Sequence, residues 1–315
     1  MTTTTRTTST TTGDRFASPV DTDRYGTYAV PQRPDDPRPL YRFTGRLTAD
    51  GSGPFPAVPG RYHLYAGWFC PWAQRVVLEI AVNGLQDVIG VSYVDDARDG
   101  RGWAFRETHG PDPVNGFTLL RDAYEVTEPG FDGHVSVPTL WDTETRQIVS
   151  NDYRTLGIDV ATQLTGFRHP GVDTYPLGLR DEIEELDAWV GPAVSSGVGR
   201  AAGDGPAAVR ARADLHAAFR RLDTRLVDGG FLVGHGLTEA DLRLWVTLAR
   251  YDVQGNAQGR LGPPLSRYPH LARYAAYLAE LPAFRATTRW SSFSAPGATP
   301  SFLDHAPTDP TGDAR

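Results

Sequence analysis

A strand, a cysteine-containing loop, a helix and a second strand are predicted to follow one another closely in the first folded region. Residues 62–66 (YHLYA) have the character of a short strand, and Pro71 is placed to open a helix that runs to about Val82 and is stopped by Gly84. The segment 87–94 (DVIGVSYV) contains several β-branched residues and predicts the second strand. This β-loop-α-β order indicates an α/β domain.

The rest of the α/β region ends in a hairpin and a helix. After a long loop and a short helical stretch (LLRDAYEV), residues 135–142 and 146–152 predict a hairpin around the sequence TET. A helix from Asp152 to about Leu164 closes the domain. The segment 165–176 (TGFRHPGVDTYP) is interpreted as a linker.

Beyond the linker, apolar residues recur at helical spacing up to about residue 285. The segment LTEADLRLWVTLARYD predicts a buried central helix, and Thr238 and Asp241 at its start have the spacing of a capping box. The second domain is therefore predicted to be all-helical. The apolar stripes that support this prediction are Leu179, Ile183, Leu186, Trp189 and Val190, followed by Leu215, Phe219, Leu222 and Leu226.

These patterns divide the chain into four segments. The first 55 residues are rich in Thr, Pro, Arg, Asp and Gly and lack apolar periodicity, so residues 1–24 are predicted to be disordered and 25–55 irregular and partly packed. The predicted segments are an N-terminal extension (1–55), an α/β domain (56–165), an all-helical domain (172–290) and a loose C-terminal tail (291–315).

The composition argues against several classes of protein. A formal net charge of −7 is unlike that of a nucleic-acid binder, which usually carries a basic patch. There is no stretch of 18 or more apolar residues, so no membrane span is expected, and the Thr-rich N-terminus lacks the apolar core of a secretory signal. The single cysteine fits a reducing cytoplasm. The histidines show no metal-ligand spacing and no phosphate-binding glycine motif occurs, so no metal and no nucleotide cofactor are expected.

Cys70, the only cysteine, has a setting that favours reactivity. It follows a strand and precedes Pro71, so its thiol would face unpaired backbone N–H groups and the positive end of a helix dipole. Arg75, one turn further on, adds positive charge. These features predict a lowered pKa and a nucleophilic thiolate. The alternative is that the apolar residues around it bury an inert thiol.

A second feature is the pair Val137-Pro138 at a strand start. Proline within a sheet is confined to edges, strand starts and bulges, and X-Pro bonds are the ones that adopt the cis form. A cis-proline exposes the backbone N–H and C=O of the preceding residue. In a thioredoxin-like fold these groups would face the reactive sulfur. The alternative is an ordinary proline at a strand start.

The motifs CPWAQR, LLRDAYEV, SVPTLWD, RQIVSND and GLTEADLRLWVTLARYD, in this order, resemble the glutathionyl-hydroquinone reductases. These enzymes are the Xi class of glutathione transferases and are related to the omega class. The resemblance covers about residues 40–285 and marks the chain as a divergent member. It implies a thioredoxin-like N-terminal domain, an all-helical glutathione-transferase-type C-terminal domain and a homodimer. It also implies reduction of a glutathionyl-hydroquinone through a mixed disulfide that a second glutathione resolves.

The resemblance further implies a thiol-binding site around Cys70, which matches the family's nucleophile. Trp103 matches an aromatic residue that packs against the bound thiol. Val137, ahead of Pro138, matches the residue whose backbone pairs with the cysteinyl unit of the thiol. Arg121 is a weaker match to a residue that holds a ligand carboxylate. Each has a structural alternative, such as loop packing for Trp103 and a solvated helix charge for Arg121.

The chain departs from the family at both of its ligand-binding positions. Where the family has Glu-Ser to hold the γ-glutamyl group, this chain has Asp152 and Tyr153, a shorter carboxylate and a large ring. Two family tyrosines that act on the hydroquinone are missing, one replaced by Gly199 and the other absent near Gly255. Each hydrogen bond that a ligand would miss for this reason is worth about 1–3 kcal/mol.

Three hypotheses follow. The leading one is a cysteine-dependent thiol oxidoreductase that removes a thiol from a thiol-quinol conjugate. The second is a thiol transferase or dehydroascorbate-type reductase that uses glutathione or another low-molecular-weight thiol such as mycothiol. Mycothiol is considered because every basic residue of the chain is arginine, which suggests a GC-rich genome. The third is a ligand-binding protein that kept the fold without catalysis.

Overall fold

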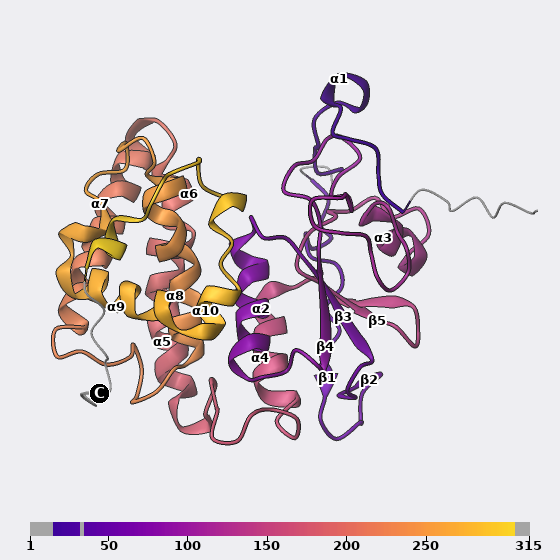
Figure 1. The fold of residues 1–315 in the computed structure, drawn as a ribbon, viewed down its shortest axis with the longest axis horizontal. Helices are drawn as coiled ribbons and strands as arrows, with labels where there is room; N and C mark the ends of the chain where they lie inside the picture. Colours follow the sequence, from indigo (N-terminus) through magenta and orange to yellow (C-terminus); the bar gives the residue numbers. More distant parts are fainter. Residues whose placement is uncertain (1–14, 32–34, 306–315) are drawn as a thin grey trace, which may run out of the picture.

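The computed structural model describes residues 15–31 and 35–305, which form two domains packed side by side (Figure 1). The first contains a mixed sheet flanked by helices, and the second is built from helices. This confirms the predicted fold class, a thioredoxin-like domain followed by an all-helical domain of the glutathione-transferase type.

A four-stranded sheet with the order β4-β3-β5-β6 forms the centre of the first domain. β3 (Tyr62–Ala66) pairs in parallel with β4 (Ile89–Tyr93) and antiparallel with β5 (Thr139–Asp142), which pairs with β6 (Gln147–Ser150). Every residue of β3 is buried, as expected for a central strand. The predicted β-loop-α-β unit and hairpin are both confirmed.

Helices cover both faces of this sheet. α2 (Pro71–Val82) and α4 (Tyr153–Gln163) pack together on the face toward the helical domain, and α3 (Arg121–Thr127) lies on the opposite face (Figure 1). α2 has the predicted bounds. It ends where Gly84 takes a left-handed conformation, with a φ of 70°.

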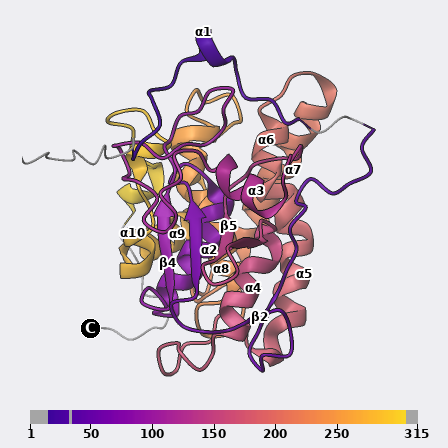
Figure 2. The ribbon, with the colours of Figure 1, turned by 90° about the vertical axis from the view of Figure 1, so that its right-hand side faces the viewer.

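The N-terminal extension runs along the outside of the α/β domain (Figure 2). It contains α1 (Thr22–Tyr25) and two short paired strands, β1 (Leu47–Thr48) and β2 (Phe55–Pro56). The backbone N–H of Ala17 donates to the carbonyl of Phe105 at 3.0 Å. The described part of this extension begins at residue 15; residues 1–14, the first part of the segment predicted to be disordered, lie outside the described residues.

The helical domain is arranged around α8, all of whose residues are buried. Its aromatic centre is Trp245, which meets Phe284 edge-on at a centroid distance of 5.5 Å. In the described part of the chain, no helix is both long and apolar enough to cross a bilayer. The helices are α5 (Arg180–Val190), α6 (Gly197–Ala201), α7 (Gly205–Arg225), α8 (Glu239–Arg250), α9 (Pro269–Glu280) and α10 (Pro282–Ala286), with π-helical turns at Gly191–Ser195 and Tyr251–Gly255.

The predicted capping box at the start of α8 is present, and it supports a stability prediction. Asp241 is fully buried and accepts hydrogen bonds from the N–H of Thr238 at 2.8 Å, the N–H of Leu232 at 2.9 Å and the hydroxyl of Tyr274 at 2.6 Å. Asp241→Asn replaces one acceptor by an amino group, so we expect it to lower the free energy of unfolding by about 2–3 kcal/mol in urea titrations.

The matched control for that variant is Thr238→Ala. It removes one hydroxyl and leaves the carboxylate in place, so its expected loss is smaller, about 1 kcal/mol. Equal urea midpoints for Asp241→Asn and the unchanged protein would contradict this account of the helix start.

The chain after α10 packs more closely than the predicted loose tail. Phe302 is fully buried and lies edge-on to Trp245 at 6.0 Å between ring centroids. The hydroxyl of Ser301 donates to Asp252 at 2.6 Å. The apolar side chain of Phe302 fills a gap in the helical core, which the sequence pattern alone did not indicate. Residues 306–315 lie outside the described residues.

Candidate active site

Cys70 lies immediately before α2, with Pro71 as the first helical residue. The backbone N–H groups of Trp72 and Ala73 act on its sulfur, as expected at the N-terminus of a helix. The thiol donates a hydrogen bond to the carbonyl of Val137, with 3.5 Å between sulfur and oxygen. The residue is a free cysteine and only 8% exposed. The sulfur therefore sits where three backbone groups meet.

Burial raises the pKa of the Cys70 thiol above its ordinary value, which corrects the predicted lowering. The two helical N–H groups and the guanidinium groups of Arg250 and Arg98 act in the opposite direction, but the desolvation of the thiolate is the larger effect. Arg75, expected to supply the positive charge, instead faces Glu239 at 3.6 Å. The sequence indicated the helix N-terminus but not the depth of the sulfur or the arginines that act on it.

The Val137–Pro138 peptide bond is cis. Val137 is 7% exposed, and its carbonyl is the group that accepts from the Cys70 thiol. Its backbone N–H forms no hydrogen bond with any residue that the structure describes. The pair thus lies against the sulfur, with one donor left for a ligand.

Trp103 is connected to the site through its contact with Phe69. Its ring stacks on Phe69, the residue before Cys70, with 4.2 Å between centroids and 26° between planes. The guanidinium of Arg98 lies over the same indole at 4.2 Å. Trp103 is 9% exposed. The structure therefore brings this predicted site residue to the loop that carries the cysteine.

Asp152 and Tyr153 stand at the start of α4, beside the start of α2. The Asp152 carboxylate accepts from the backbone N–H of Arg154 at 3.2 Å and from its side-chain Nε at 2.9 Å. The Tyr153 ring stacks on Trp72 with 4.7 Å between centroids, and Tyr41 meets it edge-on at 5.7 Å. The carboxylate is therefore engaged within the chain, and the tyrosine fills space near Cys70.

The side chain of Arg121, the remaining predicted site residue, is bound by residues that are close to it in the chain. Its guanidinium pairs with Glu125 at 3.0 Å and donates to the carbonyl of Phe131 at 2.9 Å. No contact among the described residues links it to Cys70. Its role in holding a ligand carboxylate stays a prediction.

Arg250, at the end of α8, is a residue of the site that sequence reasoning missed. It donates to the carbonyl of Trp68 at 3.1 Å, to the carbonyl of Phe69 at 3.4 Å, and to the side chain of Gln74. Burial lowers its pKa to about 10, so it remains charged at neutral pH. Within the described ranges it forms no ion pair with a carboxylate. The available signal was an arginine at the end of a helix that was predicted to be buried.

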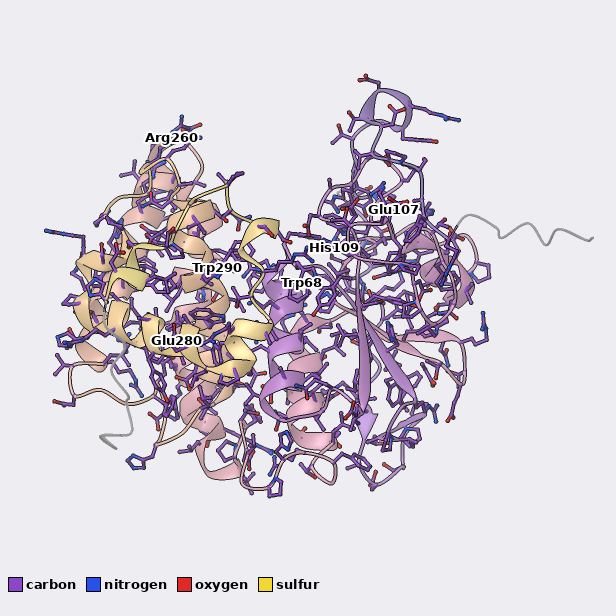
Figure 3. The ribbon with its side chains drawn as sticks, viewed as in Figure 1. Trp68, Glu107, His109, Arg260, Glu280 and Trp290 are labelled. Atoms are coloured by element: carbon purple, nitrogen blue, oxygen red, sulfur yellow. The ribbon has the colours of Figure 1, made fainter. Side chains whose placement is uncertain are left out.

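The contacts of Arg250 also join the two domains at the site. The amide of Gln74 donates to the carbonyl of Thr287 and to the hydroxyl of Thr288, both at 2.9 Å. Trp68 and His109 lie near the boundary between the domains, and Trp290 lies on the helical side of it (Figure 3). The helical domain therefore completes the surroundings of the cysteine.

The N-terminal extension supplies two tyrosines that the sequence analysis did not assign. The Tyr28 hydroxyl hydrogen-bonds to the ring of His134 at 3.1 Å and accepts from the N–H of Val135 at 3.2 Å. Tyr41 packs on Tyr153, and burial raises its pKa to about 12. No local pattern signalled these positions, because they depend on the path of an irregular segment.

The two glycines that mark the missing tyrosines have different surroundings. A Cβ added at Gly199 would meet nothing within 4 Å, whereas one at Gly255 would lie 2.5 Å from Val198. The space for a side chain at Gly199 is thus open, and the backbone at Gly255 is packed.

A cavity of about 620 Å³ lies at the other end of α2. Its lining includes Val82, Thr174, Leu237 and Phe284. Since α2 has 12 residues and rises about 1.5 Å per residue, this cavity is separated from Cys70 by most of the helix. It is not part of the candidate site.

Comparisons with known proteins agree with this fold and site. The family model for the glutathione S-transferase C-terminal domain matches residues 200–276. The chain is 35% identical over 234 residues to the glutathionyl-hydroquinone reductase PcpF of Sphingobium chlorophenolicum, covering 71% of this chain and 74% of that protein. It is also 35% identical over 223 residues to the glutathionyl-hydroquinone reductase YqjG of Escherichia coli, covering 67% of each.

Solved structures show the same relationship. A Xi-class glutathione transferase from Natrialba magadii superposes with a TM-score of 0.76 at 30% identity, covering 79% of this chain and 78% of that one. The glutathione-bound structure of YqjG from Escherichia coli superposes with a TM-score of 0.75 at 31% identity, covering 79% and 85%.

The fold and the relatives together define an enzyme of the glutathione-transferase type, a thiol oxidoreductase. Within that class, the chain belongs to the glutathionyl-hydroquinone reductase family, the Xi-class glutathione transferases. The expected family resemblance is confirmed.

Proposed function

We propose that this enzyme reductively removes a low-molecular-weight thiol, glutathione in the first instance, from a thiol-quinol conjugate through a mixed disulfide on Cys70. The observation that carries the proposal is the position of the sulfur. It lies at the N-terminus of α2, in contact with the carbonyl of Val137, with the charges of Arg98 and Arg250 acting on it. Two related proteins are named glutathionyl-hydroquinone reductases, and one of them is known with glutathione bound.

The proposed reaction has two steps. In the first, the Cys70 thiolate attacks the sulfur of the conjugate and forms an S–S bond. The carbon–sulfur bond breaks with its electron pair passing to the ring carbon, which takes up a proton, and the hydroquinone leaves. In the second, the thiolate of another thiol molecule attacks the mixed disulfide, so that the Cys70 thiolate is restored and the disulfide of the small thiol is released.

The predicted site residues have compatible positions for this chemistry. The open N–H of Val137, next to Pro138, is available to the backbone of a bound thiol. Trp103, stacked on Phe69, supplies an aromatic wall. We propose these residues, with Asp152 and Tyr153, as the thiol-binding site.

The direct test is the intact mass of the protein after incubation with oxidised glutathione. Because Cys70 is the only cysteine, a gain of one glutathionyl group that reduced glutathione removes supports the mixed disulfide. Cys70→Ser is the control. The absence of an adduct on the unchanged protein, under conditions in which a free thiol reacts, would refute the mechanism.

The raised pKa of Cys70 predicts a pH dependence. A thiol whose pKa is raised is protonated over a wider range, so its thiolate fraction grows about tenfold per pH unit until the pH passes the pKa. We expect the rate of alkylation by iodoacetamide to rise with pH through a midpoint above about 8.5, the ordinary cysteine value. A cysteine with both its amino and its carboxyl group blocked provides the reference. A midpoint below that of the reference would contradict the effect of burial.

A second candidate uses another thiol, such as mycothiol, in the same mechanism. The observation that favours it is the change in the residues at the γ-glutamyl position. The family has Glu-Ser there, whereas in this chain Asp152 pairs with Arg154 and Tyr153 stacks on Trp72. Isothermal titration of the protein with glutathione and with mycothiol separates the two. Tighter binding of glutathione would exclude the mycothiol alternative.

We also propose that the protein is a homodimer, as the family resemblance implies, and that it lies in the cytoplasm.

A further inference from the structure

The guanidinium of Arg98 contacts two aromatic rings, those of Tyr28 and Trp103. Its guanidinium carbon lies 4.2 Å from the centroid of Tyr28 and 4.2 Å from the centroid of Trp103. Contact with an aromatic ring engages the face of a guanidinium and leaves its N–H groups able to donate hydrogen bonds. Arg98 makes no hydrogen bond and no ion pair with any residue in the ranges 15–31 and 35–305.

None of the carboxylates of this loop, those of Asp95, Asp96 and Asp99, forms an ion pair with Arg98 among the described residues. Asp95 pairs with Arg106 at 3.1 Å and Asp99 pairs with Arg101 at 2.7 Å, while Asp96 lies 3.0 Å from the ring of His109 and keeps one buried oxygen without a hydrogen bond. Burial lowers the pKa of Arg98, in line with a cation that lacks a counter-charge. The loop therefore keeps one partly buried guanidinium unneutralised.

Both of these rings are bound to segments that contact the reactive sulfur. Trp103 stacks on Phe69, which precedes Cys70. The Tyr28 hydroxyl is bound to the backbone of Val135, two residues before Val137, whose carbonyl contacts the thiol. The open edge of Arg98 thus belongs to the surroundings of Cys70.

We propose that Arg98 is a specificity-determining residue that binds a carboxylate of the molecule reacting at Cys70. A guanidinium with a free edge matches the two oxygens of a carboxylate. The carboxylate has two possible sources, the thiol or the aromatic part of the conjugate. This inference rests on the proposed function and narrows it to anionic substrates. It also gives the N-terminal extension a role, because the ring of Tyr28 contacts Arg98.

The test measures the rate at which Cys70 forms a mixed disulfide, with two pairs of probes. Oxidised glutathione is compared with its glycyl ethyl ester, which tests a carboxylate on the thiol. Ellman's reagent, a carboxylated aromatic disulfide, is compared with uncharged dithiodipyridine, which tests a carboxylate on the aromatic group. In the unchanged protein we expect the carboxylated member of at least one pair to react about 10-fold faster, relative to the same pair reacting with N-acetylcysteine.

Arg98→Gln is expected to abolish that preference, and Arg98→Lys to retain part of it, since a lysine keeps the charge without the planar fork. Any effect of the removed charge on the thiolate slows both members of a pair, so their ratio isolates recognition. Arg260→Gln, at an exposed arginine of the helical domain (Figure 3), removes the same charge away from the site and should leave both ratios unchanged.

Equal ratios in the unchanged protein and in Arg98→Gln would overturn the proposal for Arg98, while adduct formation on Cys70 would still support the proposed function. Failure of every probe to form an adduct would refute the proposed function itself. Loss of the preference with the first pair alone assigns the carboxylate to the thiol, and loss with the second pair alone assigns it to the aromatic group.

Discussion

Cys70→Ser is expected to abolish thiol-dependent reduction and to lower kcat/KM by a factor of about 10³ or more. A serine hydroxyl remains protonated at neutral pH and cannot form a disulfide. The substitution is nearly isosteric at a site that is 8% exposed, so the fold should be retained. Steady-state turnover of a glutathionyl-hydroquinone, with release of the hydroquinone as the readout, measures the effect.

Two controls make this result specific. Thermal melting of Cys70→Ser should resemble that of the unchanged protein, and Cys70→Ala should lose activity to the same extent because both lack the sulfur. Retention of more than about a tenth of the activity in either variant would show that the chemistry does not pass through this cysteine.

Arg250→Met is expected to have the second largest effect, and it acts on both stability and reactivity. The variant leaves the carbonyls of Trp68 and Phe69 and the side-chain oxygen of Gln74 without their donor, which we expect to lower the free energy of unfolding by about 2–4 kcal/mol. It also removes a positive charge that stabilises the Cys70 thiolate, so the thiol pKa should rise further.

The readout for reactivity is the rate of iodoacetamide alkylation at pH 7, which should fall about 10-fold in Arg250→Met if the thiol pKa rises by about one unit. Arg250→Lys keeps the positive charge but loses the planar guanidinium that donates to several groups at once. Compared with Arg250→Met, it should therefore restore the alkylation rate more fully than the free energy of unfolding. Arg285→Gln removes an exposed arginine paired with Glu280 and should change neither quantity appreciably. An unchanged alkylation rate in Arg250→Met would show that this charge does not act on the sulfur.

The elements with strong local patterns were predictable. The strand at 62–66, the helix from Pro71 to Val82 and the capping box at Thr238 appear as expected, because a short strand-like run, a helix-starting proline and a box spacing are local signals. The packing of Phe302 was not predictable in this way. It depends on a gap in a core made by residues far away in the chain.

In the candidate site, too, some features were predictable from the sequence and others were not. Sequence placed Cys70 at the start of a helix and Val137-Pro138 at the start of a strand, and the structure brings them to 3.5 Å. Arg75 was the nearest arginine in sequence, yet its side chain points to Glu239, because positions five residues apart do not share the same face of a helix.

The class of fold and the position of the one thiol could be predicted from the amino-acid sequence alone. Those properties follow from the order of the elements and from a cysteine and a proline that are neighbours in the chain. The electrostatic character of the site, in contrast, depends on how the chain packs in three dimensions. The thiol pKa is raised because packing removes water from the sulfur, and the charges that oppose this effect come from Arg98, in a loop, and Arg250, in the other domain. Burial and distant charges both arise from tertiary packing, so no local pattern in GWFCPWAQR could have supplied them.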